Sequence, residues 1–145
     1  MRIAAGVEAA KALPFPFTLT ARAENFLFGR PDLDDTIRRL RAFEHAGADV
    51  LYAPGLPDLD AIRTVCAAVS RRVNVVAGLA GQRYSVAELA AAGVKRISLG
   101  STLARAALGA LARAGRELRT RGTFDFADEA MPFADVNALM TARGG

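Results

Sequence analysis

Short apolar segments alternate with longer amphipathic segments along most of the chain. The short segments are rich in residues that favour strands, whereas apolar residues in the longer segments recur every three or four positions, as on one face of a helix. The pattern predicts strands at residues 17–22, 48–52, 73–77 and 94–99. It predicts helices between and around them, at residues 3–13, 34–47, 58–69, 85–93 and 102–121.

Residues at the predicted helix ends have the side chains that helix termini require. Asp34 and Asp58 precede apolar helical repeats as N-caps, and Ser85 begins an S-x-x-E capping box. Gly122 follows a long Ala-rich segment, and a glycine at such a place ends a helix. The remaining residues, 123–145, contain enough apolar side chains for a docking tail with one short helix.

The order of the predicted elements indicates a parallel α/β fold. Four short strands alternate with helices in units of about 22–30 residues, a length that suits right-handed crossovers. Two closures fit this order: an open doubly wound sheet, and half of a (β/α)8 TIM barrel. The glycine-rich nucleotide-binding motifs are missing, which disfavours the open sheet. Polar residues at inward strand positions favour the barrel, namely Thr18, Thr20, Arg22, Asn74, Arg96 and Ser98.

Length and composition narrow the class of protein. A chain of 145 residues is most simply one domain, residues 1–145, and its 52% of apolar residues suffices for a buried core. No apolar run is long enough to span a membrane and no signal peptide is recognised, so a cytoplasmic protein is expected. The net charge is +4, but the 19 Lys and Arg residues are spread along helices without interleaved aromatic residues. No nucleic-acid partner is therefore expected.

A cluster of polar groups follows the first predicted strand, in the segment FTLTARAEN at residues 17–25. Arg22 shares one face of this strand with Thr18 and Thr20, because side chains alternate between the two faces. A cation on the inner face of a strand end is suited to bind an anion, and Glu24 would then either orient Arg22 or contact the substrate. A surface ion pair beyond the strand explains the same residues.

Other reactive side chains have structural explanations that compete with chemical ones. Cys66 is the single cysteine and lies in a helical pattern, where a buried thiol is expected rather than a nucleophile. His45 is at a helix end, where an imidazole caps carbonyl groups. Asp32, Asp34 and Asp35 have the chemistry of metal ligands, but acidic residues at a helix start are ordinary capping residues. No metal site is assigned to them.

Four motifs follow one another in a fixed order. They are TARAENFL at residues 20–27, GRPDLDDTIRRLRAFEHAGADVLYAPGL at 29–56, VNVVAG at 73–78 and SVAELAAAGVKRISLGSTLARAALGAL at 85–111. Together they resemble the second half of proteins of the isocitrate lyase/phosphoenolpyruvate mutase superfamily, over essentially the whole chain. The resemblance implies that the chain forms strands five to eight of a (β/α)8 barrel.

The resemblance also implies a reaction and a substrate class. The superfamily cleaves or forms a C–C bond, or rearranges a C–P bond, next to a 2-oxo acid through an enolpyruvate-type oxyanion, with Mg²⁺ as cofactor. Arg22 stands at the matching place in the TAR motif, so we expect it to bind the oxyanion or a carboxylate. Further contacts are expected from Asn74 and Ser98. Gly100 and Ser101 would either bind an anion at a helix N-terminus or simply cap that helix.

Two departures from the superfamily pattern leave the activity open. The acidic Mg²⁺ ligands and the mobile catalytic loop belong to the first half of the barrel and have no counterpart in this chain. Pro54 stands where related lyases have Glu and phosphonate mutases have His, and proline has no side-chain proton to transfer. We expect the chain to be inactive alone; the alternative is a non-catalytic half-barrel that binds a carboxylate or phosphate or serves as an oligomerisation module.

A half-barrel also has consequences for association. It leaves two open strand edges and an uncovered inner layer, both of which favour contacts with another chain. We expect a truncated product, a homo-oligomer, or pairing with a second half-barrel. In the superfamily the last helices are exchanged between subunits, which makes the segment from Leu103 onward a candidate contact. A different phosphate-binding barrel, suggested by RISLGST at residues 96–102, is the remaining interpretation.

Overall fold

The computed structural model describes residues 2–78 and 83–141 and divides the chain into two compact units, residues 1–100 and 101–145. The first unit contains a four-stranded sheet and the helices that alternate with its strands. Its elements are, in order, α1 (Arg2–Lys11), β1 (Thr20–Arg22), α2 (Leu33–His45), β2 (Val50–Tyr52), α3 (Leu59–Ala68), β3 (Arg72–Val76), α4 (Val86–Ala91) and β4 (Arg96–Ser98).

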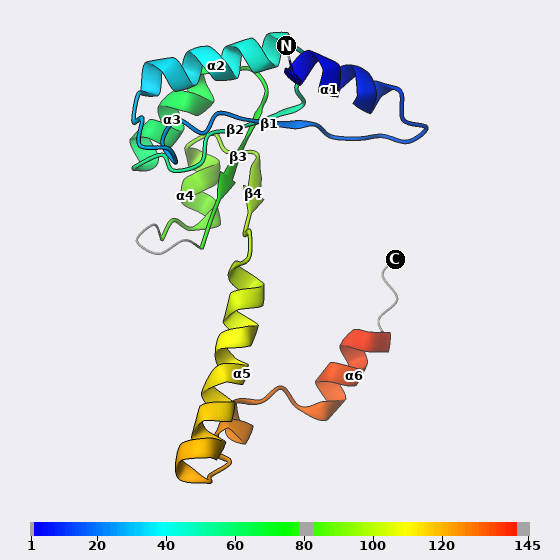
Figure 1. Cartoon of the computed structure of the whole chain (residues 1–145), viewed down its shortest axis with the longest axis vertical. Helices are drawn as coiled ribbons and strands as arrows, with labels where there is room; N and C mark the ends of the chain where they lie inside the picture. The colour runs from blue at the N-terminus through cyan, green and yellow to red at the C-terminus, as the bar shows by residue number, and fades with distance from the viewer. Residues whose placement is uncertain (1, 79–82, 142–145) are drawn as a thin grey trace. The chain divides into compact units, whose positions relative to one another are not determined.

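The four strands are parallel and lie in the sheet in the order β1-β2-β3-β4, so each strand pairs with the next strand along the chain. A doubly wound sheet would reverse direction at a switch point, and here no reversal occurs. Because parallel crossovers are right-handed, helices α2, α3 and α4 lie on the same side of the sheet (Figure 1). This arrangement confirms the predicted parallel α/β fold and is that of half a (β/α)8 barrel.

Side chains on the two faces of the sheet have different surroundings. Ala21, Leu51 and Val73 belong to the apolar core that the sheet forms with helices α2 to α4. The alternate strand positions, including Arg22 and Tyr52, therefore lie on the opposite face, which in a complete barrel faces the interior. The polar positions within the strands that the sequence places inward lie on this second face, whereas Thr18 lies outside β1.

The helix caps agree with the sequence at two of three N-termini. Asp58 caps α3 through the Ala61 amide, and Ser85 and Glu88 form the predicted capping box of α4. The cap of α2 was predicted at Asp34 and this is wrong: Asp32 is the N-cap, and its carboxylate accepts a hydrogen bond from the Asp35 amide at 2.8 Å. Asp34 lies in the first turn, where its charge favours the helix dipole.

Glu44 fastens helix α2 to the turn that precedes β3. One of its carboxylate oxygens accepts hydrogen bonds from the amide and hydroxyl of Ser70 and from the amide of Arg71, at 2.6–2.9 Å. These bonds lower the pKa of Glu44 below its ordinary value, and the bond from the Ser70 hydroxyl has the largest effect. At the end of the same helix His45 lies 2.7 Å from the Arg41 carbonyl oxygen, as expected for an imidazole that caps a carbonyl.

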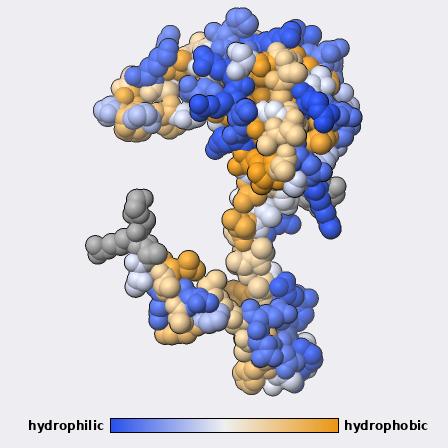
Figure 2. Space-filling view, turned by 180° about the vertical axis from the view of Figure 1, so that it is seen from behind, coloured by the Kyte–Doolittle hydropathy of each residue, from blue (hydrophilic) through white to orange (hydrophobic). Residues whose placement is uncertain are grey.

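The second unit consists of helices without a core of their own. It contains α5 (Thr102–Arg121), a short 3-10 helix η1 (Asp125–Glu129) and α6 (Phe133–Thr141), and none of these three elements contains a buried residue. Gly122 ends α5 in the left-handed conformation, as predicted. Apolar residues are exposed on the surface of this unit (Figure 2). No helix within residues 2–78 and 83–141 is long and apolar enough to cross a membrane.

Close packing between α3 and the turn after α4 gives a test of the fold. Gly93 has a φ of +93°, and a Cβ atom there would lie 2.9 Å from Cys66 Cβ. Gly93→Ala should therefore lower the free energy of unfolding by about 2–5 kcal/mol, from left-handed strain and the clash together. Urea denaturation monitored by circular dichroism measures this change in the free energy of unfolding.

Gly29→Ala is the matched control. Gly29 also has a positive φ, of +70°, but nothing lies within 4 Å of the added Cβ. We expect a cost of about 1–2 kcal/mol from backbone strain alone. Equal costs at the two glycines would show that the contact with Cys66 does not constrain the fold.

Candidate functional site

A row of side chains in register crosses the sheet, at the carboxyl ends of β1 and β2, in the middle of β3 and at the start of β4. The register pairs Arg22 with Tyr52, Tyr52 with Asn74 and Asn74 with Arg96, so these four residues stand side by side on one face. Ser98 lies two residues beyond Arg96 and is paired with Val76. Ligands of parallel α/β folds bind at the carboxyl ends of the strands, where Arg22, Tyr52 and Ser98 lie, so this row together with Ser98 is the candidate site.

Arg22 is held in place from two sides. Its guanidinium forms an ion pair with Glu24, at 2.7 Å between Nη2 and Oε1, and lies over the Tyr52 ring at 5.1 Å from the ring centroid. The side chains of Arg22 and Glu24 are 49% and 36% exposed, so the pair contributes little to stability but still limits the rotamers of Arg22. This ion pair agrees both with orientation of Arg22 by Glu24 and with a surface ion pair beyond the strand, and the half-exposed guanidinium keeps N–H groups accessible.

Tyr52 is a member of the site that sequence reasoning missed. It ends the buried strand β2, and burial raises the pKa of its phenol, while the nearby Arg22 charge opposes this change. The ring is therefore a neutral surface on which the Arg22 cation rests. Both residues end their strands, so alignment of the strand ends would have placed Tyr52 beside Arg22. The sequence alone does not show where each strand ends or how neighbouring strands are aligned.

Asn74 and Ser98 are brought together on neighbouring strands. The Asn74 side chain is almost inaccessible, at 1% exposure, and its Nδ2 donates a hydrogen bond to Ser98 Oγ at 3.0 Å. Its Oδ1 accepts a hydrogen bond from Arg96 Nη1 at 2.9 Å. Both predicted contact residues therefore lie on the same face as Arg22, and their role toward a ligand stays a prediction.

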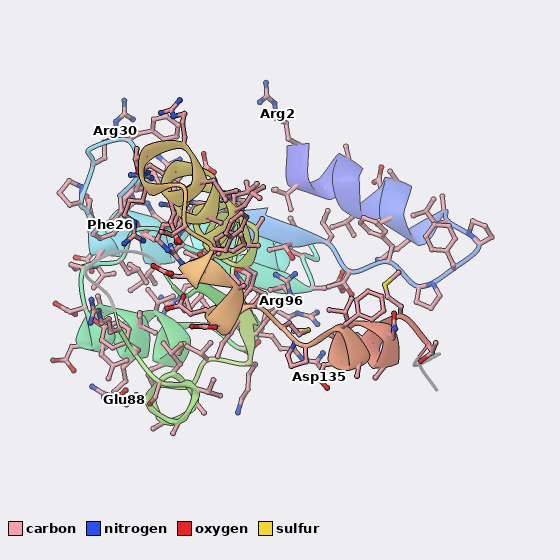
Figure 3. The ribbon with its side chains drawn as sticks, turned by 90° about the horizontal axis from the view of Figure 1, so that it is seen from below. Arg2, Phe26, Arg30, Glu88, Arg96 and Asp135 are labelled. Atoms are coloured by element: carbon pink, nitrogen blue, oxygen red, sulfur yellow. The ribbon has the colours of Figure 1, made fainter. Side chains whose placement is uncertain are left out.

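A second polar cluster lies in the loop after β1. The buried Asn25 donates a hydrogen bond to the carboxylate of Asp35, which also pairs with Arg38 and, at 2.6 Å, with Arg39. The bond from Arg39 is the main cause of the lowered pKa of Asp35, and the bond from Asn25 acts in the same direction. The adjoining hollow of about 480 Å³ is lined by Glu24, Asn25, Phe28, Arg30 and Arg39 (Arg30 is labelled in Figure 3).

Two of the three acidic residues at the start of α2 thus have structural partners. Asp32 caps the helix and Asp35 is held by arginines, as the capping interpretation expects. In the part of the chain that the structure describes, no group of three or more His, Cys, Asp or Glu side chains could hold a metal ion. Burial raises the pKa of the half-buried Cys66 thiol, which agrees with a structural role for this residue.

The remaining predicted residues lie at strand ends or at the boundary between the units. Pro54 follows β2 by two residues, beyond Tyr52, and contributes no group that could transfer a proton. Gly100 ends the first unit and Ser101 begins the second, where it is the N-cap of α5 without a side-chain capping bond. Binding of an anion by Gly100 and Ser101 stays a prediction.

The fold defines the class of protein as a (β/α)8-type scaffold, of which four strands are present in the described residues. A sequence model of the family described as phosphoenolpyruvate phosphomutase matches residues 1–119, and the chain belongs to this family. This confirms the superfamily expected from the four motifs. A comparison with curated proteins finds no match.

Solved structures of similar proteins agree with this assignment. A "putative lyase/mutase" from Burkholderia cenocepacia J2315 is 62% identical, with a TM-score of 0.90 over 97% of this chain and 51% of that chain. A "putative phosphonomutase" from the same organism is 35% identical, with a TM-score of 0.71 over 80% of this chain and 48% of that one. Phosphonopyruvate hydrolase in complex with oxalate and Mg²⁺ is 25% identical, with a TM-score of 0.72 over 96% and 50%. The chain spans about half the length of these structures.

The Asp35 cluster predicts a pH-dependent contribution to stability. Because the pKa of Asp35 is lowered in the folded chain, its ionised form stabilises the fold above the ordinary value of 3.8, and this is lost as the pH falls through the lowered pKa. Asp35→Asn should therefore lower the urea midpoint at pH 7, and the difference from the unsubstituted chain should shrink at pH 3.

Asp60→Asn is the control for this measurement. Asp60 also lies in the first turn of a helix and pairs with an arginine three residues on, but it is exposed and binds no residue of the β1 loop. We expect a smaller change at pH 7 for this variant. The same small change in both variants would contradict a stabilising role for the cluster around Asp35.

Proposed function

We propose that the chain supplies one half of a lyase or phosphonomutase active site, with Arg22 as the residue that binds the anionic oxygen of the substrate. The observation that carries this proposal is the position of Arg22: it ends a barrel strand, is oriented by Glu24 and Tyr52, and leaves N–H donors accessible. A guanidinium matches the planar geometry of a carboxylate with two parallel hydrogen bonds.

The proposed chemistry is that of the family, on a small 2-oxo or 2-hydroxy carboxylic acid. Cleavage of a C–C bond, or of a C–P bond, next to the oxo group leaves an enolpyruvate-type oxyanion, and a fixed cation lowers the barrier by stabilising that charge as it develops. Arg22 is assigned this role, with Asn74 and Ser98 as hydrogen-bonding groups on the same face. Oxalate and 3,3-difluorooxalacetate, found in complexes of similar proteins, are both small dicarboxylates, which is the kind of ligand proposed here.

The family's Mg²⁺ does not fit the donor groups of the described residues. A magnesium site needs several oxygen ligands in an octahedral arrangement, and within the described residues no group of three or more His, Cys, Asp or Glu side chains could supply them. We therefore assign no reaction step to a metal held by these residues. On this proposal the chain does not turn over substrate by itself.

Pro54 favours a second candidate function. It occupies the strand end where the resemblance places a proton-transferring Glu or His, so the site binds an anion without an acid or base at that position. A non-catalytic half-barrel that binds a carboxylate or phosphate is the resulting alternative. Binding is common to both candidates, and turnover by an assembled barrel distinguishes them.

Binding of oxalate tests the site that both candidates share. Arg22→Met removes the charge and all donors at similar length, so the dissociation constant of oxalate measured by calorimetry should rise about 10- to 100-fold. Arg63→Met is the control, because Arg63 is an exposed arginine on α3 paired with Asp60. Equal affinities of the unsubstituted chain and Arg22→Met would refute an anion site at Arg22.

Turnover is measured as release of pyruvate or glyoxylate from 2-hydroxy and 2-oxo dicarboxylates, with and without Mg²⁺. We expect no release from this chain alone. Mg²⁺-dependent release that disappears in Arg22→Met would show instead that copies of this chain assemble a complete site with metal ligands that we have not identified.

We further propose that the second unit packs against another chain. Leu103, Leu111 and Leu118 recur along α5 at helical spacing and are each exposed, and α6 exposes Phe133 and Leu139. Apolar side chains that find no core within their own unit favour association. A homo-oligomer or a pairing with a second half-barrel would cover them.

Sedimentation tests this association. The chain should sediment with more than its own mass of 15.3 kDa at micromolar concentration, and Leu111→Glu should shift it toward the monomer because a charge is costly in an apolar contact. Thr120→Glu introduces the same charge on another side of α5 and should leave the mass unchanged. A monodisperse monomer would contradict the proposed contact.

A further inference from the structure

Three side chains on the last two strands form a connected series of hydrogen bonds. Arg96 Nη1 donates to Asn74 Oδ1 at 2.9 Å, and Asn74 Nδ2 donates to Ser98 Oγ at 3.0 Å. Arg96, labelled in Figure 3, is exposed, whereas Asn74 is buried and Ser98 is half-buried. The series therefore runs from a solvent-accessible cation through a buried amide to a hydroxyl.

The chemistry of the three groups gives the series a direction. A guanidinium can only donate hydrogen bonds, so the amide oxygen of Asn74 must face Arg96 and its NH2 group must face Ser98. Ser98 Oγ accepts the bond from Asn74, which directs its own hydrogen elsewhere. Its bond to the Val75 carbonyl oxygen is long, at 3.5 Å. An acceptor at an ordinary distance would therefore receive the hydrogen bond from Ser98 Oγ instead.

We infer that Arg96 is a positioning residue, which acts through Asn74 to present the Ser98 hydroxyl as a hydrogen-bond donor to an anionic oxygen of the ligand. The inference rests on the proposed anion site at Arg22, and it adds a second donor to the same ligand, on the same face but from β4 at the other edge of the sheet. Arg96 polarises the amide and the amide polarises the hydroxyl, because successive bonds in one direction strengthen each other. Replacement of Arg96 would allow the Asn74 side-chain amide to flip, so that its oxygen and nitrogen exchange places, and the Ser98 hydroxyl would lose its fixed orientation.

A simpler role for Arg96 would be direct attraction of the anion by its charge. The two roles differ in how Arg96 and Ser98 depend on each other. If Arg96 acts through Ser98, then removal of the hydroxyl removes the benefit of Arg96 as well; if Arg96 attracts the ligand directly, the two effects add.

Oxalate binding by calorimetry to single and double variants separates these roles. Arg96→Met and Ser98→Ala should each weaken binding about three- to tenfold, as expected for loss of one hydrogen bond. The double variant should bind no more weakly than the weaker single variant, and Arg96→Lys, which keeps a charged donor, should recover part of the affinity. Arg72→Met is the matched control, because Arg72 is an exposed arginine on the same face of β3 as Asn74.

A second measurement needs no ligand. The side-chain amide resonances of Asn74 in a ¹H–¹⁵N spectrum should shift in Arg96→Met and stay in place in Arg72→Met, and the spectrum also reports whether each variant is folded. If Arg96→Met does not fold, the comparison is made with Arg96→Lys and Ser98→Ala.

The outcomes separate this inference from the proposed function. Additive losses in the double variant, or oxalate binding that depends on Arg22 but not on Arg96 and Ser98, would overturn the role of Arg96 and leave the anion site intact. A chain that binds no oxalate at all would overturn both.

Discussion

The parallel pairing of each strand with its successor is the constraint on which the rest of the first unit depends. Because every crossover has the same hand and moves in the same direction, all the connecting helices gather on one side of the sheet. The apolar core then forms on that side alone, around Leu51 and Val73. The other side of the sheet does not pack against these helices, so polar and charged groups there cost the apolar core little stability.

The polar row results from two features: the apolar core lies on one side of the sheet only, and the register aligns residues of neighbouring strands. The parallel register places the end of β1 opposite the start of β4, so residues far apart in the chain, such as Arg22 and Arg96, belong to one row across the sheet. Each then interacts with a neighbour on the adjacent strand, Arg22 with the Tyr52 ring and Arg96 with the Asn74 amide. The site is thus built from cross-strand pairs rather than from one contiguous segment.

The sequence predicted those features that depend on local chemistry. The strand and helix order, the capping box at Ser85 and the polar end of β1 follow from short-range preferences, which survive in the fold. The cap at Asp32 was assigned two residues too late, because Asp34 and Asp35 in the first turn look like caps as well. β1, β2 and β4 were predicted too long, chiefly at their starts, and β3 was predicted one residue too late, because the sequence pattern does not show which residues are paired. Tyr52 and the bond between Asn25 and Asp35 were missed because each depends on register or on a loop conformation, which no local pattern specifies.

The shortness of the strands sets the depth of the site. β1, β2 and β4 contain three residues each, so they extend over about 10 Å, and each strand offers two side chains at most to the inner face. The row that contains Tyr52 and Asn74 therefore supplies most of the side chains on this face. A ligand bound on this face would be contacted by only these few side chains, so the exchange of a single one would change which ligands fit.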